Sequence, residues 1–177
     1  MTETTLHDQP LTFTSEQTQQ IDRCLLRLAD HTGSPLVMIA DVSGRLVLYR
    51  GRLSEAQSTG LSALAAGGFA AGLGIGHFLG LRDQNSFSSQ LLEGNLANLY
   101  IMAIGPELLL ITAFTQQTTL GMVRLFAEQA QQELLIIAEE ASEAREKMLA
   151  ETSLLPEEGF GEELNRQLDE LFDGGFE

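Results

Sequence analysis

Several residue types are scarce in this sequence, and each scarcity narrows the class of protein. Among 177 residues there is no tryptophan and a single cysteine, Cys24. One thiol excludes an internal disulfide and is typical of a reducing, cytoplasmic environment. Basic residues are also few, ten against 25 acidic ones, for a net charge of −15. Phosphate backbones and anionic membrane surfaces repel so acidic a chain, which argues against nucleic-acid binding.

The acidic excess is concentrated at one end of the chain. Residues 139–177 hold thirteen acidic and three basic residues, a net of −10, and the remainder carries −5. This acidic third is either a solvated segment that keeps the protein soluble or a contact for a basic protein surface. Glu3, Asp8 and Glu16 precede any apolar run, so we expect no signal peptide and a cytoplasmic protein.

Residues that carry catalysis or bind metals are sparse and scattered. His7, His31 and His77 lie far apart without ligand spacing, so we expect no metal site. The stretch "GLGIG" at 72–76 lacks the third glycine of a dinucleotide loop, because His77 stands in its place. No Ser-His-Asp arrangement or pair of carboxylates can be placed. We therefore expect neither catalytic residues nor a cofactor.

Hydrophobic periodicity predicts an alternation of helices and strands. Three helices are expected: one opened by a Thr14–Gln17 capping box and ended by Gly33, one over 61–80, and one from about Thr118. Five strands are expected, at 36–41, 45–50, 86–94, 95–105 and 107–114. The first two read as a hairpin and the last three as an antiparallel meander.

The two ends of the chain are expected to lie outside this domain. Residues 1–13 read as a flexible, polar lead-in, 14–150 as one domain, and 151–177 as an acidic linker with an amphipathic tail helix. The segment "TSLLPEEG" before the tail helix reads as a hinge, since Pro156 disfavours helix at Leu155. The apolar stripe of the tail helix is formed by Phe160, Leu164, Leu168, Leu171 and Phe172.

The element order α-β-β-α-β-β-β-α resembles the roadblock / dynein light chain family. The motifs are "VMIADVSGRLVLYRG", "LSALAAGGFAAG", "LLEGNLANLYIMAIGPELLLITAF" and "TTLGMVRLFAEQA", over about residues 20–138. The tail "GFGEELNRQLDELF" is similar to that of the bacterial MglB branch. The resemblance implies an α+β fold, in which a five-stranded antiparallel sheet has the first and last helices on one face and the middle helix on the other.

The resemblance also implies partners. Roadblock domains form homodimers by joining sheets edge to edge and laying two middle helices side by side. Dimers of the MglB type bind a small Ras-like GTPase and stimulate its GTP hydrolysis without inserting an arginine finger. They favour the GTPase conformation in which its own catalytic groups are in place.

The expected middle helix, 61–80, contains six glycines, although each glycine inside a helix costs about 1 kcal/mol relative to alanine. Two rows of small residues at four-residue spacing would let another backbone approach closely: Gly68, Gly72 and Gly76, and Ala66, Ala70 and Gly74. We interpret the segment as a helix with one flat face on its own sheet and a second flat face that meets the partner protomer and the GTPase, and a tightly packed core helix is the alternative. Membrane insertion is not expected, because the segment is rich in Gly and Ala rather than Leu and carries His77.

These rows and the resemblance give candidate site residues. The sequence does not show which row faces the second protomer and which faces the GTPase. The GTPase-binding candidates are Ala63, Ala66, Gly67, Ala70 and Gly74, and the dimer-interface candidates are Gly68, Gly72, Phe87 and Leu91. The tail stripe, Phe160 to Phe172, is expected to dock on the GTPase. Arg50 and Arg52 either reach a phosphate or balance the acidic chain.

Two other functions remain open. A roadblock protein can act as a dimeric scaffold without touching GTP chemistry. The order of helices and strands is also similar to that of PAS-like sensors, but "LVMIA" and "LLLITAF" offer almost no polar lining for a ligand cavity.

Overall fold

A computed structural model describes residues 10–81 and 87–153. The chain divides into two compact units, Met1–Ser142 and Glu143–Glu177, and the fold below belongs to the first. The second contains the last turns of the long C-terminal helix. The expected tail helix, with Phe160, Leu164, Leu168, Leu171 and Phe172, lies outside the described residues, and the 14–150 domain boundaries stay a prediction.

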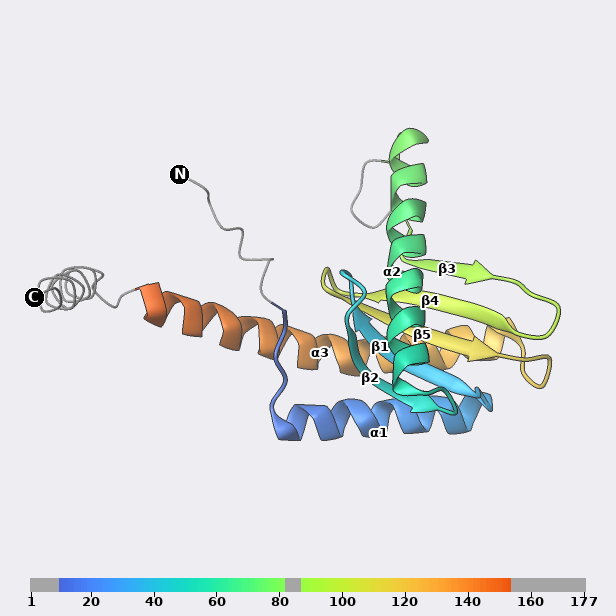
Figure 1. Cartoon of the computed structure of the whole chain (residues 1–177), viewed down its shortest axis with the longest axis horizontal. Coiled ribbons are helices and arrows are strands. Elements are labelled where there is room, and N and C mark those ends of the chain that lie inside the picture. The colour runs from blue at the N-terminus through green and yellow to red at the C-terminus, as the bar shows by residue number, and fades with distance from the viewer. Residues whose placement is uncertain (1–9, 82–86, 154–177) are drawn as a thin grey trace, which may run out of the picture. The chain divides into compact units, whose positions relative to one another are not determined.

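The described elements occur in the expected order, α-β-β-α-β-β-β-α (Figure 1). They are α1 Ser15–Thr32, β1 Leu36–Asp41, β2 Leu46–Gly51, α2 Glu55–Phe78, β3 Ser89–Leu92, β4 Asn98–Ile104, β5 Leu108–Phe114 and α3 Leu120–Ser153. The five strands form one sheet in the order β2-β1-β5-β4-β3, and every neighbouring pair is antiparallel. The predicted hairpin and meander are confirmed, and β2 and β3 are the two edges.

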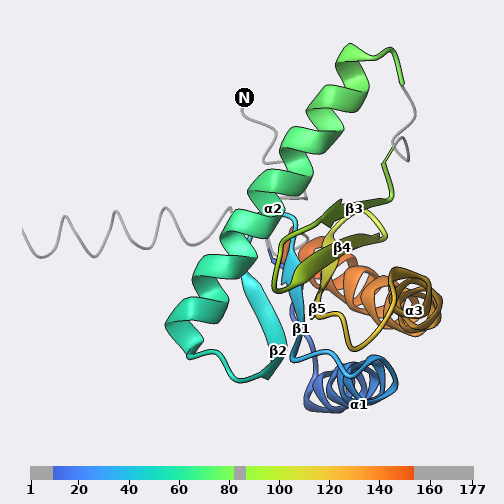
Figure 2. The ribbon, with the colours of Figure 1, turned by 90° about the vertical axis from the view of Figure 1, so that its right-hand side faces the viewer.

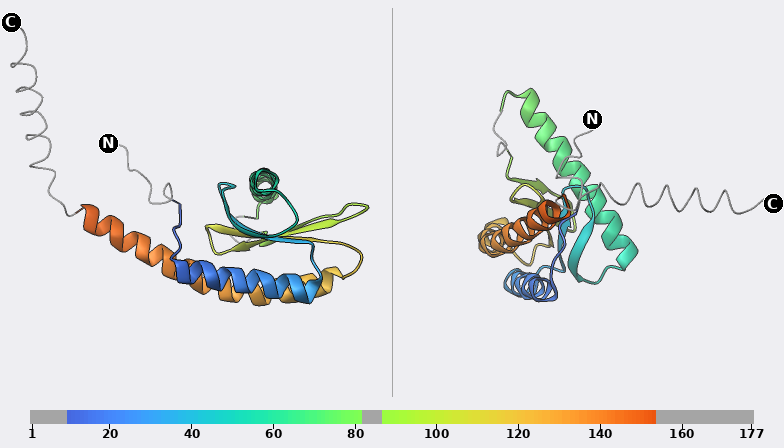
Figure 3. Two further views of the ribbon diagram at one scale, coloured as in Figure 1. Left: turned by 60° about the horizontal axis from the view of Figure 1, so that its bottom comes forward. Right: turned by 90° about the vertical axis from the view of Figure 1, so that its left-hand side faces the viewer.

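Helices cover both faces of the sheet, as expected. Side chains of a strand alternate between faces, and successive residues of β5 divide accordingly. Leu108 and Leu110 pack into one core cluster with α1 and α3, whereas Leu109 and Ile111 pack into the other with α2. The two layers are seen on opposite sides of the sheet in Figure 3. Among the buried side chains of β1 and β5 only Thr112 is polar, which disfavours a PAS-like ligand cavity.

Local signals in the sequence explain where α1 begins and ends. The hydroxyl of Thr14 accepts from the Gln17 backbone at 3.2 Å, and the Gln17 side chain accepts from the Thr14 backbone at 3.0 Å. This reciprocal pair satisfies two N–H groups that the first turn leaves without helical partners. Gly33 ends the helix in the left-handed conformation, at φ 60°. Both predicted end signals are therefore confirmed.

Other boundaries differ from the predicted ones. A second capping box, Ser54 with Gln57, starts α2 six residues before 61. β3 is shorter than the predicted strand 86–94, and Phe87 precedes it. Leu11 and Phe13, in the expected flexible lead-in, pack against the α1–α3 core cluster. Burial of these apolar side chains explains why this part of the lead-in packs on the domain, although a flexible, polar segment is predicted there.

The turn between β1 and β2 is held against α2 by direct contact. The Ser62 hydroxyl donates to the Gly44 carbonyl at 2.8 Å. Gly44 adopts φ +90°, and a Cβ placed on it would lie 2.7 Å from the Cα of Ala63. Glycine is thus required here by both its backbone conformation and the close approach of the helix.

We expect Gly44→Ala to destabilise the fold by about 2 kcal/mol or more, because the backbone strain of a positive φ and the steric clash with Ala63 both lower the free energy of unfolding. The midpoint of urea unfolding, with the slope unchanged, measures this. Gly60→Ala is the matched control, since a Cβ there meets nothing within 4 Å. Equal midpoints for Gly44→Ala and the unmodified protein would contradict the tight docking of this turn.

Candidate functional site

Helix α2 crosses the sheet and continues past the β3 edge (Figures 1 and 2). It contacts β1, β2, β3 and β5. Its buried residues are Ser58, Ser62, Ala65, Ala66, Phe69 and, near the end of the helix, Gly76. The last turns stand clear of the sheet, where Ile75 is 58% and Phe78 92% exposed. This end of α2 therefore presents large apolar side chains to solvent.

Neither predicted row of small residues stays on one face of α2. Each step of four residues turns about 40° around a helix with 3.6 residues per turn. The row Ala66, Ala70, Gly74 accordingly starts buried on the sheet and ends exposed. The row Gly68, Gly72, Gly76 runs the other way, from exposed to buried.

The exposed side of α2 is instead divided into two strips with 4-3-4 spacing. Ala63, Gly67, Ala70 and Gly74 form the small strip, which borders the β1–β2 turn through Ala63 and Gly44. Leu64, Gly68, Ala71 and Ile75 form the apolar strip, about 100° further round the helix and on its opposite flank. Four of the five GTPase-binding candidates thus share the small strip. Ala66 does not, because it faces the sheet.

The dimer-interface candidates are more dispersed. Gly68 lies in the apolar strip, and Phe87 is half-buried just before β3. Leu91 packs toward α1 and α3. Gly72 is covered by its own chain, because the Gln90 side chain of β3 lies against it and donates to the Phe69 carbonyl at 3.1 Å. The space that glycine leaves at position 72 is therefore used inside the protomer.

Other exposed glycines of α2 have no such occupant. A Cβ placed on Gly60, Gly67, Gly68 or Gly74 would meet nothing within 4 Å. The described part of the protomer therefore gives no steric reason for glycine at these positions. α2 is also the one described helix long and apolar enough to cross a membrane, with a mean hydropathy of 1.4 over 18 residues, of which 28% are buried. A helix that packs on its own sheet meets the same criteria.

The two edges of the sheet differ in their side chains. β2 carries a bulge opposite Ile39/Ala40, and the Arg50 Nε donates to the Asp22 carboxylate of α1 at 2.6 Å. This hydrogen bond holds the pKa of Arg50 above its usual range. Because Arg50 is engaged within the chain, the structure favours charge balance over phosphate binding for it. β3, "SQLL", carries neither charge nor bulge.

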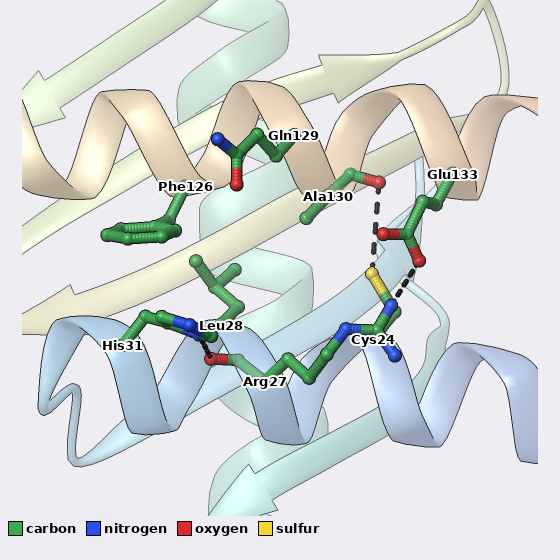
Figure 4. A pocket seen from close by; sticks show the side chains of 8 residues that line it. All are labelled: Cys24, Arg27, Leu28, His31, Phe126, Gln129, Ala130 and Glu133. Atoms are coloured by element: carbon green, nitrogen blue, oxygen red, sulfur yellow. Dashed lines mark hydrogen bonds and ion pairs between the residues drawn. The ribbon is translucent and has the colours of Figure 1, made fainter.

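A small cavity of about 50 Å³ lies between α1 and α3 (Figure 4). His31 stacks on Phe126 with 4.6 Å between ring centroids, and Arg27 pairs with Glu133 across the two helices. Cys24 forms part of its lining, and burial first, then Glu133, raises the pKa of its thiol to about 11. No group of three or more metal-binding side chains occurs within residues 10–81 and 87–153.

A sheet covered by α1 and α3 on one face and by a single, overhanging helix on the other defines the roadblock class of fold. MglB from Myxococcus xanthus is 30% identical, with a TM-score of 0.66, over 74% of this chain and 96% of its own. The gliding protein MglB from Thermus thermophilus is 25% identical, with a TM-score of 0.67, over 75% of this chain and 98% of its own. An MglB described with a tetrameric arrangement is 25% identical, with a TM-score of 0.68 and the same coverage.

These similarities identify the family. The chain belongs to the roadblock family, in its MglB-like branch. No protein-family model matches the sequence, and no curated protein matches it. The predicted family and fold are thereby confirmed, and the roles of individual residues are a separate question.

We expect Gly67→Ala and Gly74→Ala to stabilise the isolated protein, each by roughly 0.5–1 kcal/mol, because alanine favours helix and the added Cβ meets open space. Unfolding in urea without any partner measures this. Gly33→Ala is the contrasting variant, since φ 60° at Gly33 makes the same chemical change destabilising. A loss of stability at Gly67 or Gly74 would mean that another part of the chain covers the small strip.

Proposed function

We propose that this protein is a homodimeric regulator of a small Ras-like GTPase of the MglA type and stimulates its GTP hydrolysis. The observation that carries the proposal is the division of α2 into a small strip and an apolar strip, both exposed. One side of the helix is suited to lasting burial against a large apolar surface, and the other to close approach by a second backbone. The similarity to MglB proteins supports both roles.

The apolar strip and the β3 edge are the proposed dimer interface. Contiguous patches of exposed apolar side chains mark interaction sites, and interfaces between permanent subunits are more apolar than transient ones. Leu64, Ile75 and Phe78 are exposed on α2, and Leu92 and Leu96 are exposed at the β3–β4 end. β3 is the better edge for pairing because charge and bulges, which discourage pairing, occur on β2. The tetrameric arrangement described for one MglB supports further association of such dimers.

The small strip is the proposed GTPase surface. Side chains of one carbon or none let a partner's backbone come close enough for many contacts at optimal separation. The β1–β2 turn extends this surface with Val42, which is exposed. The turn is rigidly seated on α2 through Ser62 and Gly44, so it can hold a partner in one orientation.

The charges around the small strip support stimulation without an arginine finger. Arg45 is the arginine that follows the turn, and its guanidinium is 3.4 Å from the Asp41 carboxylate. Asp41 also accepts from the Arg45 backbone at 2.8 Å, which ties both parts of Arg45 to the turn. The Arg45 side chain is 55% exposed, so this ion pair contributes at most about 1 kcal/mol and biases the guanidinium toward the turn rather than fixing it there. Stimulation then follows from binding the competent GTPase conformation more tightly than the others.

We expect two matched substitutions on α2, Gly74→Arg and Gly68→Arg, to separate the two surfaces. The positions are about 120° apart around the helix, and each Cβ points into open space, so both variants fold. Gly74→Arg stays dimeric but weakens GTPase binding at least about tenfold, because the long cation prevents close approach. Gly68→Arg becomes monomeric. Light scattering and phosphate release by a purified MglA-type GTPase measure the two effects.

Leu26→Arg on α1 is the control, because it adds the same charge on the other face of the sheet. A monomeric unmodified protein at micromolar concentration would refute the dimer. Unchanged affinity of Gly74→Arg for the GTP-loaded partner would refute the assignment of the small strip.

The tail stripe, Phe160 to Phe172, is proposed as a second docking element that contacts the GTPase away from α2. Only about four turns long and acidic, such a segment gains most of its helical stability from a partner. We expect deletion of 156–177 to preserve the dimer and its thermal stability but weaken GTPase binding, with a smaller salt dependence than the full chain shows. Titrations of the GTPase from 50 to 500 mM salt, about a tenfold range of ionic strength, measure this. Equal affinities of the truncated protein and the full chain for the GTPase at every salt concentration would refute a binding role for the tail.

A further inference from the structure

Val42 is an exposed apolar residue on the β1–β2 turn, and the register of the sheet shows on which face it lies. Side chains of a strand alternate between faces, and Ala40 of β1 packs in the core cluster that contains α2. The ladder between β1 and β5 continues one step past Asp41, because the Val42 N–H donates to the Glu107 carbonyl at 2.9 Å. The alternation therefore places Val42 on the α2 face of the sheet and Asp41 on the opposite face.

Val42 stands beside the small strip of α2 without being covered by it. The turn approaches α2 closely at Gly44, two residues after Val42, where a Cβ would lie 2.7 Å from the Cα of Ala63. Val42 is nevertheless 49% exposed, whereas Ala40 is fully buried. It is also the one apolar side chain among residues 41–45. A single exposed apolar side chain is common on protein surfaces, so what distinguishes Val42 is how firmly its backbone is held.

The turn that carries Val42 is closed by hydrogen bonds on both sides of this residue. The Asp41 N–H donates to the Arg45 carbonyl, and the Gly44 N–H donates to the Asp41 carbonyl, each at 2.9 Å. The Ser62 hydroxyl of α2 donates to the Gly44 carbonyl at 2.8 Å. Together with the ladder bond of Val42 itself, these bonds tie the turn both to the sheet and to α2.

The Asp41 carboxylate adds further contacts from the opposite face. Its Oδ1 accepts from the Ser43 hydroxyl at 2.5 Å and from the Arg45 backbone N–H at 2.8 Å. Hydrogen bonds to an ionised oxygen are about twice as strong as those between neutral groups, and the Asp41 side chain is only 15% exposed. Its Oδ2 lies 3.4 Å from the exposed Arg45 guanidinium, and such a surface ion pair adds little. The two hydrogen bonds to Oδ1 therefore hold the turn more firmly than the ion pair does.

We propose that Val42 is an anchor residue for the GTP-loaded GTPase and that Asp41 is the positioning residue that sets its orientation. This part rests on the proposed function, in which the small strip binds the GTPase. An anchor that is already held in its bound orientation loses little conformational freedom on binding, so more of the contact energy appears as affinity. The partner must then offer an apolar depression beside the segment that lies on the small strip. Asp41 lies on the other face, so it acts through Val42 rather than by touching the GTPase.

The dissociation constant for the GTPase, loaded with a non-hydrolysable GTP analogue, tests the anchor. Val42→Ala should raise this constant at least about fivefold, because the truncated side chain leaves the apolar depression unfilled. Leu26→Ala is the matched control. Leu26 is 48% exposed on α1, on the other side of the sheet, and its truncation should change the constant less than about twofold.

Two substitutions of Asp41 separate its hydrogen bonds from its ion pair. Asp41→Asn keeps an oxygen at the Oδ1 position, so it should bind the GTPase within about twofold of the unmodified protein although the ion pair with Arg45 is lost. Asp41→Ala removes the acceptor of both hydrogen bonds and should weaken binding at least about fivefold. Equal weakening by the two substitutions would overturn positioning through hydrogen bonds.

A double-mutant cycle tests whether Asp41 acts through Val42. In the Val42→Ala background, Asp41→Ala should weaken binding less than about twofold, because the anchor that it positions is already gone. Losses that multiply would show that Asp41 acts independently of Val42 and would overturn the positioning role. If Asp41→Ala fails to fold, Ser43→Ala takes its place in the cycle, since it removes one of the two donors to Oδ1.

The outcomes separate this inference from the proposed function. Unchanged binding by Val42→Ala, with binding by Gly74→Arg weakened, would overturn the anchor and leave the GTPase regulator intact. No binding of the GTPase by the unmodified protein would refute the proposed function and the anchor with it. A loss on Val42→Ala that Asp41→Ala reproduces but does not deepen would support both roles.

Discussion

Strands β1 and β5 are buried on both faces, and this requirement organises the rest of the protomer. Their side chains are almost entirely aliphatic, so each face of the sheet must be covered by another apolar layer. On one face α1 and α3 do this together. On the other, α2 alone crosses the strands. A seven-residue strand is about 23 Å long and a helix about 10 Å wide, so one crossing helix covers a band of the sheet and leaves its flanks open.

This geometry explains why α2 contains so many glycines. The reason differs from one glycine to another. Gly72 makes room for Gln90, which anchors the helix backbone to the edge strand β3. Gly76 is buried. Gly67, Gly68 and Gly74 border only solvent in the described protomer and reduce the helix propensity of α2 there. The difference separates glycines that the fold itself requires from those whose reason must be sought in another molecule.

Much of the fold could be predicted from the sequence because its signals are local. Thr14, Gln17 and Gly33 act on their own helix, and alternation in β1 and β5 reports burial directly. The α2 surface is harder to predict because rows spaced by four residues drift around a helix, and the row Ala66, Ala70, Gly74 therefore contains one residue, Ala66, that faces the sheet. The contact of Gln90 with Gly72 joins residues eighteen positions apart in sequence, and no local pattern encodes it. The Ser54–Gln57 capping box is also a local signal, so the start of α2 at Glu55 is predictable from the sequence.

Both capping boxes have a consequence for how the protein responds to acid. Their third helical residue is glutamine, Gln17 in α1 and Gln57 in α2, where a glutamate is the common alternative. An amide does not titrate, so the starts of these two helices keep their hydrogen bonds as pH falls. The chain meanwhile loses its net charge near its isoelectric point of about 4.4. Mutual repulsion between molecules, which keeps an acidic protein dispersed, therefore vanishes at a pH where these helix starts are still intact.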